Sequence, residues 1–544
     1  MLVAGALVAS CADYNSTNDF HVDADTSIIQ PYTDFNPIKS YIDKTANPNL
    51  EVGATVDITE FNKQELTHSA IMTNFDNVSF GKSLMSGTIV SSKGIMNFIN
   101  MMDLLDHMEE IGGTVFGSPI VANANQADGW IDMLTAPIEI TVDYVEGKTV
   151  NFNDYAVGAY DGTNKNSKVL AKIAKYDNQN TLSLPSQSKA NIIEGFQVDD
   201  KATYTTTFWV KCDKDASFLV KFSGNTVAGT ATADGKWKVG AGKWTKVVVE
   251  SKAAEGETDG YLEIEMVRGS AMYVQKVEVG YFPDNHIEQT PEQKNDTIMY
   301  ALNTWCDGLM KINNGRIKSF DLIDEPIDNT TLKGDIYDLK HSVANRYWQD
   351  ILGSENYAPA VAKIAREKFA EYEGNPADLK FFISETGLEE PKKLESLVEW
   401  IKIWDKNGAN IDGITAKVNL VYYENQEKQN VCKNSYEVLL DNLGKTGKLI
   451  RLTNFDIKYV DKDGLAVTTA NITDEQRQAL ADFNAYAIKA YMNKIPKDKQ
   501  AGICKSNLID TNSDPVGLWT PNSKTKDWMR TATYKAWCEA LSGK

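Results

Sequence analysis

Phe320-Asp-Leu-Ile-Asp324-Glu325-Pro326 is a short apolar segment that ends in two carboxylates and a proline. A second segment of this kind is Arg451-Leu-Thr-Asn454-Phe-Asp-Ile-Lys-Tyr459, which carries an amide partway along. Short apolar runs are typical of buried parallel strands, and functional side chains in α/β barrels lie at the carboxyl ends of such strands. The two segments therefore predict two strands of one sheet, with Glu325 and Asn454 at its functional edge.

Strand-like and helix-like segments alternate from Pro37 to Trp130, and the alternation resumes after Pro291. Strands are expected where β-branched and aromatic residues form short runs, and helices where apolar residues recur with helical spacing. The expected strands are 50–56, 114–121, 318–323, 379–383, 411–420, 449–457 and 501–509, and the expected helices are 62–75, 95–111, 296–312, 356–372, 392–407 and 473–494. About eight such units predict a (β/α)8 TIM barrel of the α/β class.

The rhythm changes between Ile138 and Phe282, where short β-rich runs are separated by Gly, Asn and Asp turns. The clearest runs are 204–210, 244–250, 260–266 and 272–279. This pattern predicts an all-β sandwich of the jelly-roll kind, inserted after the third barrel strand. The expected boundaries are 37–137 for the first part of the barrel, 138–283 for the insert and 284–544 for the second part of the barrel.

The N-terminus is short and apolar and ends Leu7-Val8-Ala9-Ser10-Cys11, which resembles a bacterial lipobox. Residues 1–11 would then be a lipoprotein signal, Cys11 the lipidated residue and 12–36 a flexible tether. This interpretation implies an exported, lipid-anchored protein of a Gram-negative bacterium, at the outer membrane, the cell surface or the periplasm. The alternative is a frayed terminus with a chance cysteine. No later stretch approaches the roughly 18 apolar residues of a spanning helix.

Charge and composition limit the partners. The 544 residues carry a net charge of −19, which argues against nucleic acid and anionic membrane surfaces. The six cysteines are scattered without a CxxC pair, so buried free thiols are expected. The five histidines are scattered as well, and we expect no metal site and no cofactor.

Taken in order, these segments resemble glycoside hydrolase family 10, the retaining endo-β-1,4-xylanases. The resemblance covers 37–137 and 284–544, and it rests most on Gly408-Ala-Asn-Ile-Asp-Gly-Ile414, on 443–453 and on 473–503. A sandwich at this loop is also similar to a known arrangement, and the insert resembles carbohydrate-binding modules of families 4 and 22. The resemblance implies a barrel that binds xylan-type polysaccharide.

The expected active site departs from the family pattern. The resemblance makes Glu325 the general acid/base, and it places the nucleophile at Asn454, whose amide cannot form a glycosyl-enzyme ester. Asp324 would raise the pKa of Glu325 by like-charge repulsion, provided the two side chains meet. Further strand ends have also changed, and the remaining substrate-binding candidates there are Asn123, Asp324, Glu385 and Asn419. Xylanase specificity and the retaining mechanism are therefore not carried over.

Aromatic side chains suit the apolar faces of sugar rings. Trp130 and Tyr422 follow strand ends and are candidates for a cleft. In the insert, Trp237 lies in an expected turn and is the preferred platform, whereas Trp209 and Trp244 lie within β-rich runs and are more often core.

The sequence thus favours a catalytically impaired, glycan-binding protein of a polysaccharide-utilisation system. One alternative is an active hydrolase, xylanase-like or substrate-assisted, with Glu325 as general acid. A second alternative is a scaffold lipoprotein without affinity for sugar. An open aromatic-lined cleft would favour the binding protein. A second carboxyl group across the cleft from Glu325 would favour the enzyme, and a filled barrel mouth would favour the scaffold.

Overall fold

The computed structural model describes residues 32–110, 112–229, 234–268, 271–522 and 527–543. The chain divides into two compact units, one formed by the residues up to Thr135 together with Pro291 onward, and the other by Ala136–Thr290. Each unit has its own hydrophobic core. Cys11, the expected signal 1–11 and most of the expected tether lie outside the described residues.

The first unit is a closed parallel barrel. Its sheet follows the chain order of the strands, and it closes because the last strand pairs with the first, with Val52 opposite Ile503. The strands are β1 (Glu51–Thr55), β2 (Asn77–Ser79), β3 (Thr114–Gly117), β19 (Ser319–Asp324), β22 (Lys380–Thr386), β23 (Gly413–Lys417), β25 (Leu449–Thr453) and β27 (Gln500–Lys505). A short strand β4 (Val121–Ala122) continues β3 and pairs with β19. The predicted (β/α)8 TIM barrel is confirmed.

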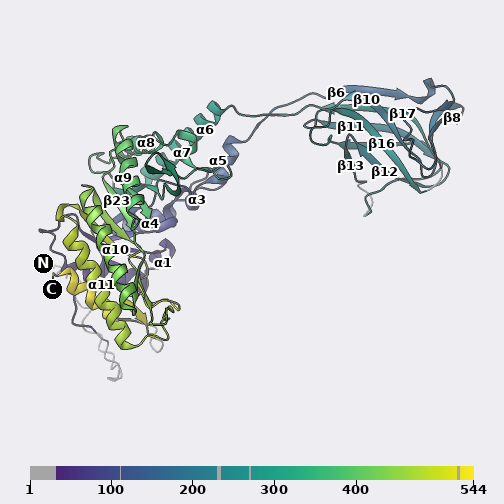
Figure 1. The fold of residues 1–544 in the computed structure, drawn as a ribbon. Helices are drawn as coiled ribbons and strands as arrows, with labels where there is room; N and C mark the ends of the chain where they lie inside the picture. Colours follow the sequence, from purple (N-terminus) through teal and green to yellow (C-terminus); the bar gives the residue numbers. More distant parts are fainter. Residues whose placement is uncertain (1–31, 111, 230–233, 269–270, 523–526, 544) are drawn as a thin grey trace, which may run out of the picture. The chain divides into compact units, whose positions relative to one another are not determined.

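Helices of this unit surround the barrel strands (Figure 1). They are α1 (Ile58–Asn62), α2 (Leu66–Asn74), α3 (Ser86–Ile89), α4 (Ile99–Glu110), α5 (Asp128–Thr135), α6 (Pro291–Asn313), α7 (Trp348–Leu352), α8 (Tyr357–Glu371), α9 (Pro391–Lys406), α10 (Gln426–Lys445), α11 (Asp474–Lys494) and α12 (Ala532–Leu541). Sequence explains several of the starts: α9 begins at a proline, and Thr473 and Gln476 form a capping box at α11. No helix among the described residues is long and apolar enough to cross a membrane.

One predicted helix is divided. The segment 62–75 was expected as a single helix, but α1 ends at Asn62 and α2 begins at Leu66. Between them Gln64 has a φ of 57°, in the left-handed region that a helix does not contain. Helical periodicity alone does not reveal such a break.

Packing of large side chains holds the helices against the barrel. Trp400 and Trp404 of α9 are fully buried, with ring centroids 5.9 Å apart, and Tyr357 of α8 meets Trp404 edge-on at 5.6 Å. Burial of such side chains supplies most of the stability of a helix in a folded protein. This packing keeps the carboxyl ends of the strands in fixed positions.

Three two-stranded ribbons accompany the barrel. They are β20 (Ile327–Lys333) with β21 (Ile336–Leu339), β24 (Leu420–Tyr423) with β26 (Ile457–Val460), and β28 (Trp519–Pro521) with β29 (Trp528–Arg530). The first two follow directly after β19, β23 and β25, so they continue the strands whose ends carry the candidate site.

The second unit contains two antiparallel sheets around one core. The seven-stranded sheet contains β15 (Thr245–Ser251), β11 (Thr203–Cys212), β17 (Met272–Phe282), β9 (Gln179–Leu184), β8 (Lys172–Tyr176), β7 (Gly158–Ala159) and β6 (Val145–Asn151). The five-stranded sheet contains β10 (Lys189–Gln197), β16 (Asp259–Arg268), β12 (Ala216–Phe222), β13 (Asn225–Val227) and β14 (Trp237–Val239). A separate pair joins β5 (Ile138–Glu139) to β18 (His286–Ile287). Burial alternates along β11 and β12, as in a two-layer sandwich.

Candidate active site

The carboxyl ends of the barrel strands surround a pocket of about 320 Å³. Most of the side chains that line it are polar or charged, and they come from the strands and from the residues that follow them. The lining includes Ser79, Lys82, Ser118, Asp321, Asp324, Glu325, Ser384, Lys417, Arg451, Thr453 and Asn454. Glu325 and Asn454, which the sequence placed at the ends of two different strands, are thus brought into one pocket, together with Asp324.

A lysine lies between the two predicted carboxylates. Lys417, the last residue of β23, donates from Nζ to Asp324 Oδ1 at 2.6 Å and to Glu325 Oε1 at 2.9 Å. A second ammonium group, that of Lys340, lies 3.6 Å from Glu325 Oε2. Glu325 is therefore held on both carboxylate oxygens by cations.

The backbone explains why Asp324 and Glu325 meet the same ammonium group. Consecutive residues of a regular strand point to opposite faces, so the two were not required to meet. Glu325 follows β19 directly, and its φ of 46° lies in the left-handed region. Its amide N–H donates to the Ser384 carbonyl at 2.7 Å, which fixes this turn of the chain. The turn allows both side chains to face Lys417.

The charge of Lys417 decides the protonation of Glu325. Partial burial of Glu325 would raise its pKa, but Lys417, Lys340 and Lys393 together outweigh burial and hold the pKa below its ordinary value. The expected rise of this pKa through repulsion from Asp324 is therefore wrong, because a cation lies between the two carboxylates. Glu325 is ionised at neutral pH and has no proton to donate.

Asn454 lies at the mouth with an unusual backbone, since its φ is 54°. Its side-chain Oδ1 accepts a hydrogen bond from Ser506 Oγ at 3.4 Å. The next carboxylate along the chain, Asp456, bonds to the buried Lys505 and accepts from the Asn507 N–H at 3.1 Å, and it does not line the pocket. At the position that the resemblance assigns to the nucleophile, the chain therefore presents an amide to the mouth.

A second layer of charge lies below the mouth. Asp321 is buried, and burial raises its pKa to about 7, although Arg451 and the hydrogen bond from Thr415 Oγ1 at 2.6 Å oppose the rise. The Arg451 guanidinium lies 4.0 Å from the centroid of the Phe116 ring. Phe116, the one aromatic residue that lines the pocket in the described chain, is only 4% exposed and therefore does not form an open stacking surface.

The structure corrects the expected role of Glu385. Its side chain is fully buried, 2.9 Å from the ammonium group of Lys393, and it accepts hydrogen bonds from the Ile327 and Thr386 N–H groups, both at 3.0 Å. A carboxylate with no exposed surface cannot contact a sugar. Glu385 instead ties β22 to the start of β20.

The two polar residues Asn123 and Asn419 are placed outside the mouth pocket. Asn123 is half-buried directly after β4. Asn419 is exposed, donates to Thr386 Oγ1 at 3.5 Å, and lines a separate hollow of about 770 Å³ beside α10.

The three predicted aromatic platforms are placed against cores. Trp130 is buried in α5 at 6% exposure, in the barrel core, so it does not line the cleft as expected. Tyr422 packs against Tyr459 and Phe483, with centroids at 4.9 and 5.9 Å. Trp237 packs on the sandwich core, and its Nε1 donates to the Val227 carbonyl at 2.9 Å. The turn assigned to Trp237 from its flanking glycines is strand β14, which explains its inward packing.

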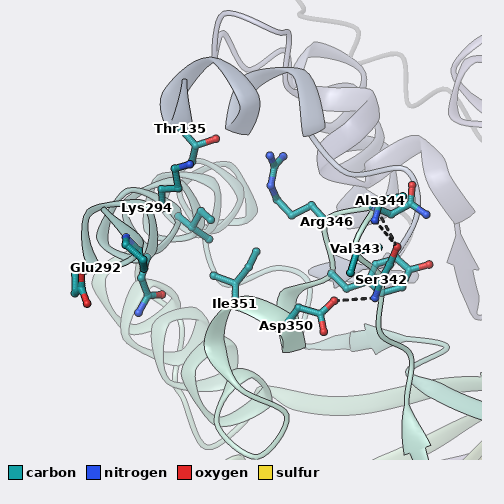
Figure 2. A pocket seen from close by; sticks show the side chains of 14 residues that line it. Thr135, Glu292, Lys294, Ser342, Val343, Ala344, Arg346, Asp350 and Ile351 are labelled. Atoms are coloured by element: carbon teal, nitrogen blue, oxygen red, sulfur yellow. Dashed lines mark hydrogen bonds between the residues drawn. The ribbon is translucent and has the colours of Figure 1, made fainter. Parts of the chain in front are cut away.

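A larger hollow lies elsewhere on the barrel unit. It has a volume of about 710 Å³ and is lined by residues of α6 and of the loop around Ser342–Arg346 (Figure 2). Asp350 accepts a hydrogen bond from the Ser342 N–H at 3.0 Å there, and Arg346 is paired with Asp132. None of the strand-end residues of the mouth lines this hollow, so it does not share the candidate site.

Lys417, Arg451 and Asp321 also line the mouth, and the sequence did not single them out as site residues. Lys417 carries a signal, since it is a lysine directly at the end of the apolar segment Gly413–Ala416. Its partners lie 92 and 93 residues away, and no local pattern indicates that pairing.

Comparisons with known proteins agree with this architecture. Residues 281–529 match the family model for glycosyl hydrolase family 10. Xylanase B from Clostridium stercorarium F9 has a similar fold, with 11% identity and a TM-score of 0.52 over 93% of this chain and 100% of that chain. The intracellular xylanase TsXylA from Thermoanaerobacterium saccharolyticum is 10% identical, with a TM-score of 0.50 over 93% of this chain and 99% of that chain. A mutant protein in complex with xylotriose is 10% identical, with a TM-score of 0.50 over 92% of this chain and 99% of that chain.

At these identities the solved structures show the fold alone, and no curated protein matches the sequence. The family match contains β19, β22, β23, β25 and β27, whose ends form most of the mouth. The match to glycosyl hydrolase family 10 thus covers most of the second part of the barrel, and the fold is similar to that of these xylanases.

Two positions of the mouth differ from those that the resemblance assigns to retaining glycoside hydrolysis. That chemistry needs a protonated acid and a carboxylate nucleophile about 5–5.5 Å apart. At the position that the resemblance assigns to the acid, Lys417 holds Glu325 in its ionised form. At the position that the resemblance assigns to the nucleophile, the residue is Asn454. Among the described residues no cluster of histidine, cysteine or carboxylate ligands could hold a metal ion. The groups that remain can form hydrogen bonds and ion pairs with a ligand.

Proposed function

We propose that this protein is a catalytically impaired relative of the family 10 xylanases that binds a xylan-type polysaccharide without hydrolysing it. The observation that carries the proposal is the Lys417 ammonium group, which bonds to both Asp324 and Glu325 at the barrel mouth. The lysine thus neutralises the carboxylate that the resemblance makes the general acid/base.

The requirements of glycosidic cleavage explain why this protein would bind a glycan without hydrolysing it. Glycosidic cleavage requires proton donation to the leaving oxygen, and an ionised Glu325 has no proton to give. It also requires either attack by a carboxylate or assistance from the substrate, and Asn454 offers only an amide. The lysine and the amide both remain able to hydrogen-bond sugar hydroxyl groups.

The choice of ligand follows from the relatives. A similar barrel is known in complex with xylotriose. The mouth of this chain, at about 320 Å³, lies at the lower end of the range for small-molecule sites. We therefore propose a short section of a xylan-type chain as the ligand of the barrel.

We further propose that the protein is exported and anchored by a lipid on Cys11, as part of a system that uses polysaccharides. The support is the segment Leu7-Val8-Ala9-Ser10-Cys11 and the polar residues that follow it. An anchored binding protein would retain glycan at a membrane surface.

The test of binding is native gel electrophoresis in gels that contain soluble xylan, mannan or β-glucan, with purified full-length protein. We expect retardation in the xylan gel that increases with the xylan concentration and is absent in gels without polysaccharide. Mobility that is unchanged in every gel would refute glycan binding and would favour a scaffold role.

A further inference from the structure

The outward face of the seven-stranded sheet carries aromatic residues that do not belong to the core. Along β11 the side chains alternate, so that Phe208 and Val210 are buried and Trp209 is partly exposed between them. Trp209 is absent from the sandwich core against which Trp237 packs. The expectation that Trp209 is a core residue is therefore wrong, because the strand register turns it outward.

Three more aromatic rings lie at one end of the same sheet. Tyr176 of β8 and Tyr273 of β17 stack with centroids 3.7 Å apart and planes 9° apart. Trp244, just before β15, meets Tyr176 edge-on at 6.4 Å. All three rings are partly exposed, and none belongs to the sandwich core. Trp244, like Trp209, was expected to be core and is not.

Register places Trp209 and the stacked pair next to each other. Lys211, two residues after Trp209 on the same face of β11, is directly opposite Tyr273. Its ammonium group lies 5.5 Å from the centroid of the Tyr176 ring. Residues two apart on a strand are separated by about 7 Å. Trp209, Tyr273 and Tyr176 therefore form one stripe, which we call the aromatic stripe.

Neighbouring contacts hold the rings in place. Tyr176 donates from its hydroxyl group to Asp213 Oδ1 at 2.5 Å, and Trp244 donates from Nε1 to Asp177 Oδ2 at 3.2 Å. Rings fixed in this way lose little conformational entropy when a ligand stacks on them.

Cations flank Trp209 on both neighbouring strands. Lys246 and Lys276 are its direct cross-strand partners on β15 and β17, and their ammonium groups lie 5.7 and 5.6 Å from the centroid of its ring. Lys276 is paired with Glu278, and Lys211 is paired with Asp177. Within the described part of the chain, Lys246 forms no ion pair with a carboxylate.

We propose that the aromatic stripe binds the pyranose rings of a xylan-type chain, and that Lys246 binds a carboxylate of an acidic sugar attached to that chain. The proposal rests on the proposed function, because it assigns glycan binding to a particular face. A sugar ring has an apolar face and polar edges, which suits rings bordered by lysines. Protein interfaces are depleted in lysine at their centres, so this surface fits a charged glycan better than a protein partner.

The test compares variants of the full-length protein in native gels that contain either neutral xylan or xylan substituted with uronic acid. We expect Trp209→Ala and, separately, Tyr273→Ala to weaken binding to both by about tenfold, as the loss of one stacked ring implies. Tyr300→Ala removes an aromatic ring that is 61% exposed on α6 and serves as the matched control, with unchanged binding. Thermal unfolding identifies any variant that has lost its fold.

Lys246→Met tests the acidic sugar. We expect this variant to lose about threefold in affinity for the acidic xylan at low ionic strength, and to bind neutral xylan as the parent protein does. Folded Trp209→Ala and Tyr273→Ala variants that bind as the parent protein does would overturn the aromatic stripe and leave the proposed function standing. Failure of the parent protein itself to bind any xylan would overturn both. Equal loss on neutral and acidic xylan for Lys246→Met would overturn the acidic ligand.

Discussion

Replacing Lys417 by methionine tests how the mouth is built. Methionine keeps the unbranched apolar stem of lysine and removes the ammonium group, which donates at 2.6 and 2.9 Å to two carboxylates. A hydrogen bond to a charged group contributes about 1.5–3 kcal/mol when it is sheltered. The side chains of Lys417 and Asp324 are each 22% exposed and that of Glu325 is 34% exposed, so water screens part of this energy. We expect a loss of about 2–3 kcal/mol in the free energy of unfolding at pH 7.

The destabilisation caused by Lys417→Met should depend on pH in a defined direction. Because the folded-state pKa of Glu325 is lowered, its stabilising contribution is complete above its ordinary pKa of 4.5 and is lost as the pH falls through the lowered value. The difference between the parent protein and Lys417→Met should therefore be largest near pH 7 and should shrink as the pH approaches 3.

The assay is urea unfolding followed by circular dichroism at several pH values. Lys318→Met is the matched control, since Lys318 is 57% exposed and pairs with Asp378 at 3.3 Å, and we expect it to change stability by less than about 0.5 kcal/mol. A destabilisation by Lys417→Met that is the same at pH 7 and pH 3, or no larger than that of the control, would refute the reasoning.

Three further predictions concern the same barrel. Lys505→Met leaves Asp456 without its buried cation and should cost about 3–5 kcal/mol in urea unfolding, and a cost below about 1 kcal/mol would contradict the pairing. Because the folded-state pKa of Asp321 is raised to about 7, the free energy of unfolding should decrease as the pH rises from about 5 to 8. Asp321→Asn should make this decrease smaller by about 2–3 kcal/mol, and a decrease of unchanged size would contradict the raised pKa. Asn454→Glu alone should release no reducing sugar from xylan, because Glu325 stays ionised beside Lys417, and measurable release would show that Glu325 can still donate a proton.

Most strands and helices of the barrel could be predicted because each is indicated by the residues within its own segment. β19, β22, β25 and β27 are buried on both faces, so each contains several apolar residues close together and can be recognised without knowledge of its neighbours. α11 carries its capping residues in the sequence, and its predicted span, 473–494, is close to the helix Asp474–Lys494.

The site was less predictable because it depends on contacts between distant strands. Asn454 and Glu325 could be placed at strand ends from the sequence, but the ion pairs of Lys417 with Asp324 and Glu325 depend on the closure of the barrel. The burial of Glu385 depends in the same way on Lys393, which follows on the next helix. Side-chain protonation at the mouth is therefore a property of the folded barrel.

Single aromatic residues were the least predictable part. The flanking glycines of Trp237 suggested an exposed turn, yet a short strand turns its ring inward. The alternation of Tyr204, Phe208 and Val210 on the inner face of β11 is the signal that could have placed Trp209 outside. Exposure of one ring depends on strand register, and register is set by neighbouring strands.

The most direct test of the central claim is the release of reducing sugar from xylan by the purified full-length protein, with Glu325→Gln assayed in parallel. We expect no release by either protein above that of a heat-denatured sample, at protein concentrations at which the parent protein is retarded in xylan gels. Release by the parent protein that disappears in Glu325→Gln would contradict the account, because it would show that Glu325 donates a proton despite Lys417.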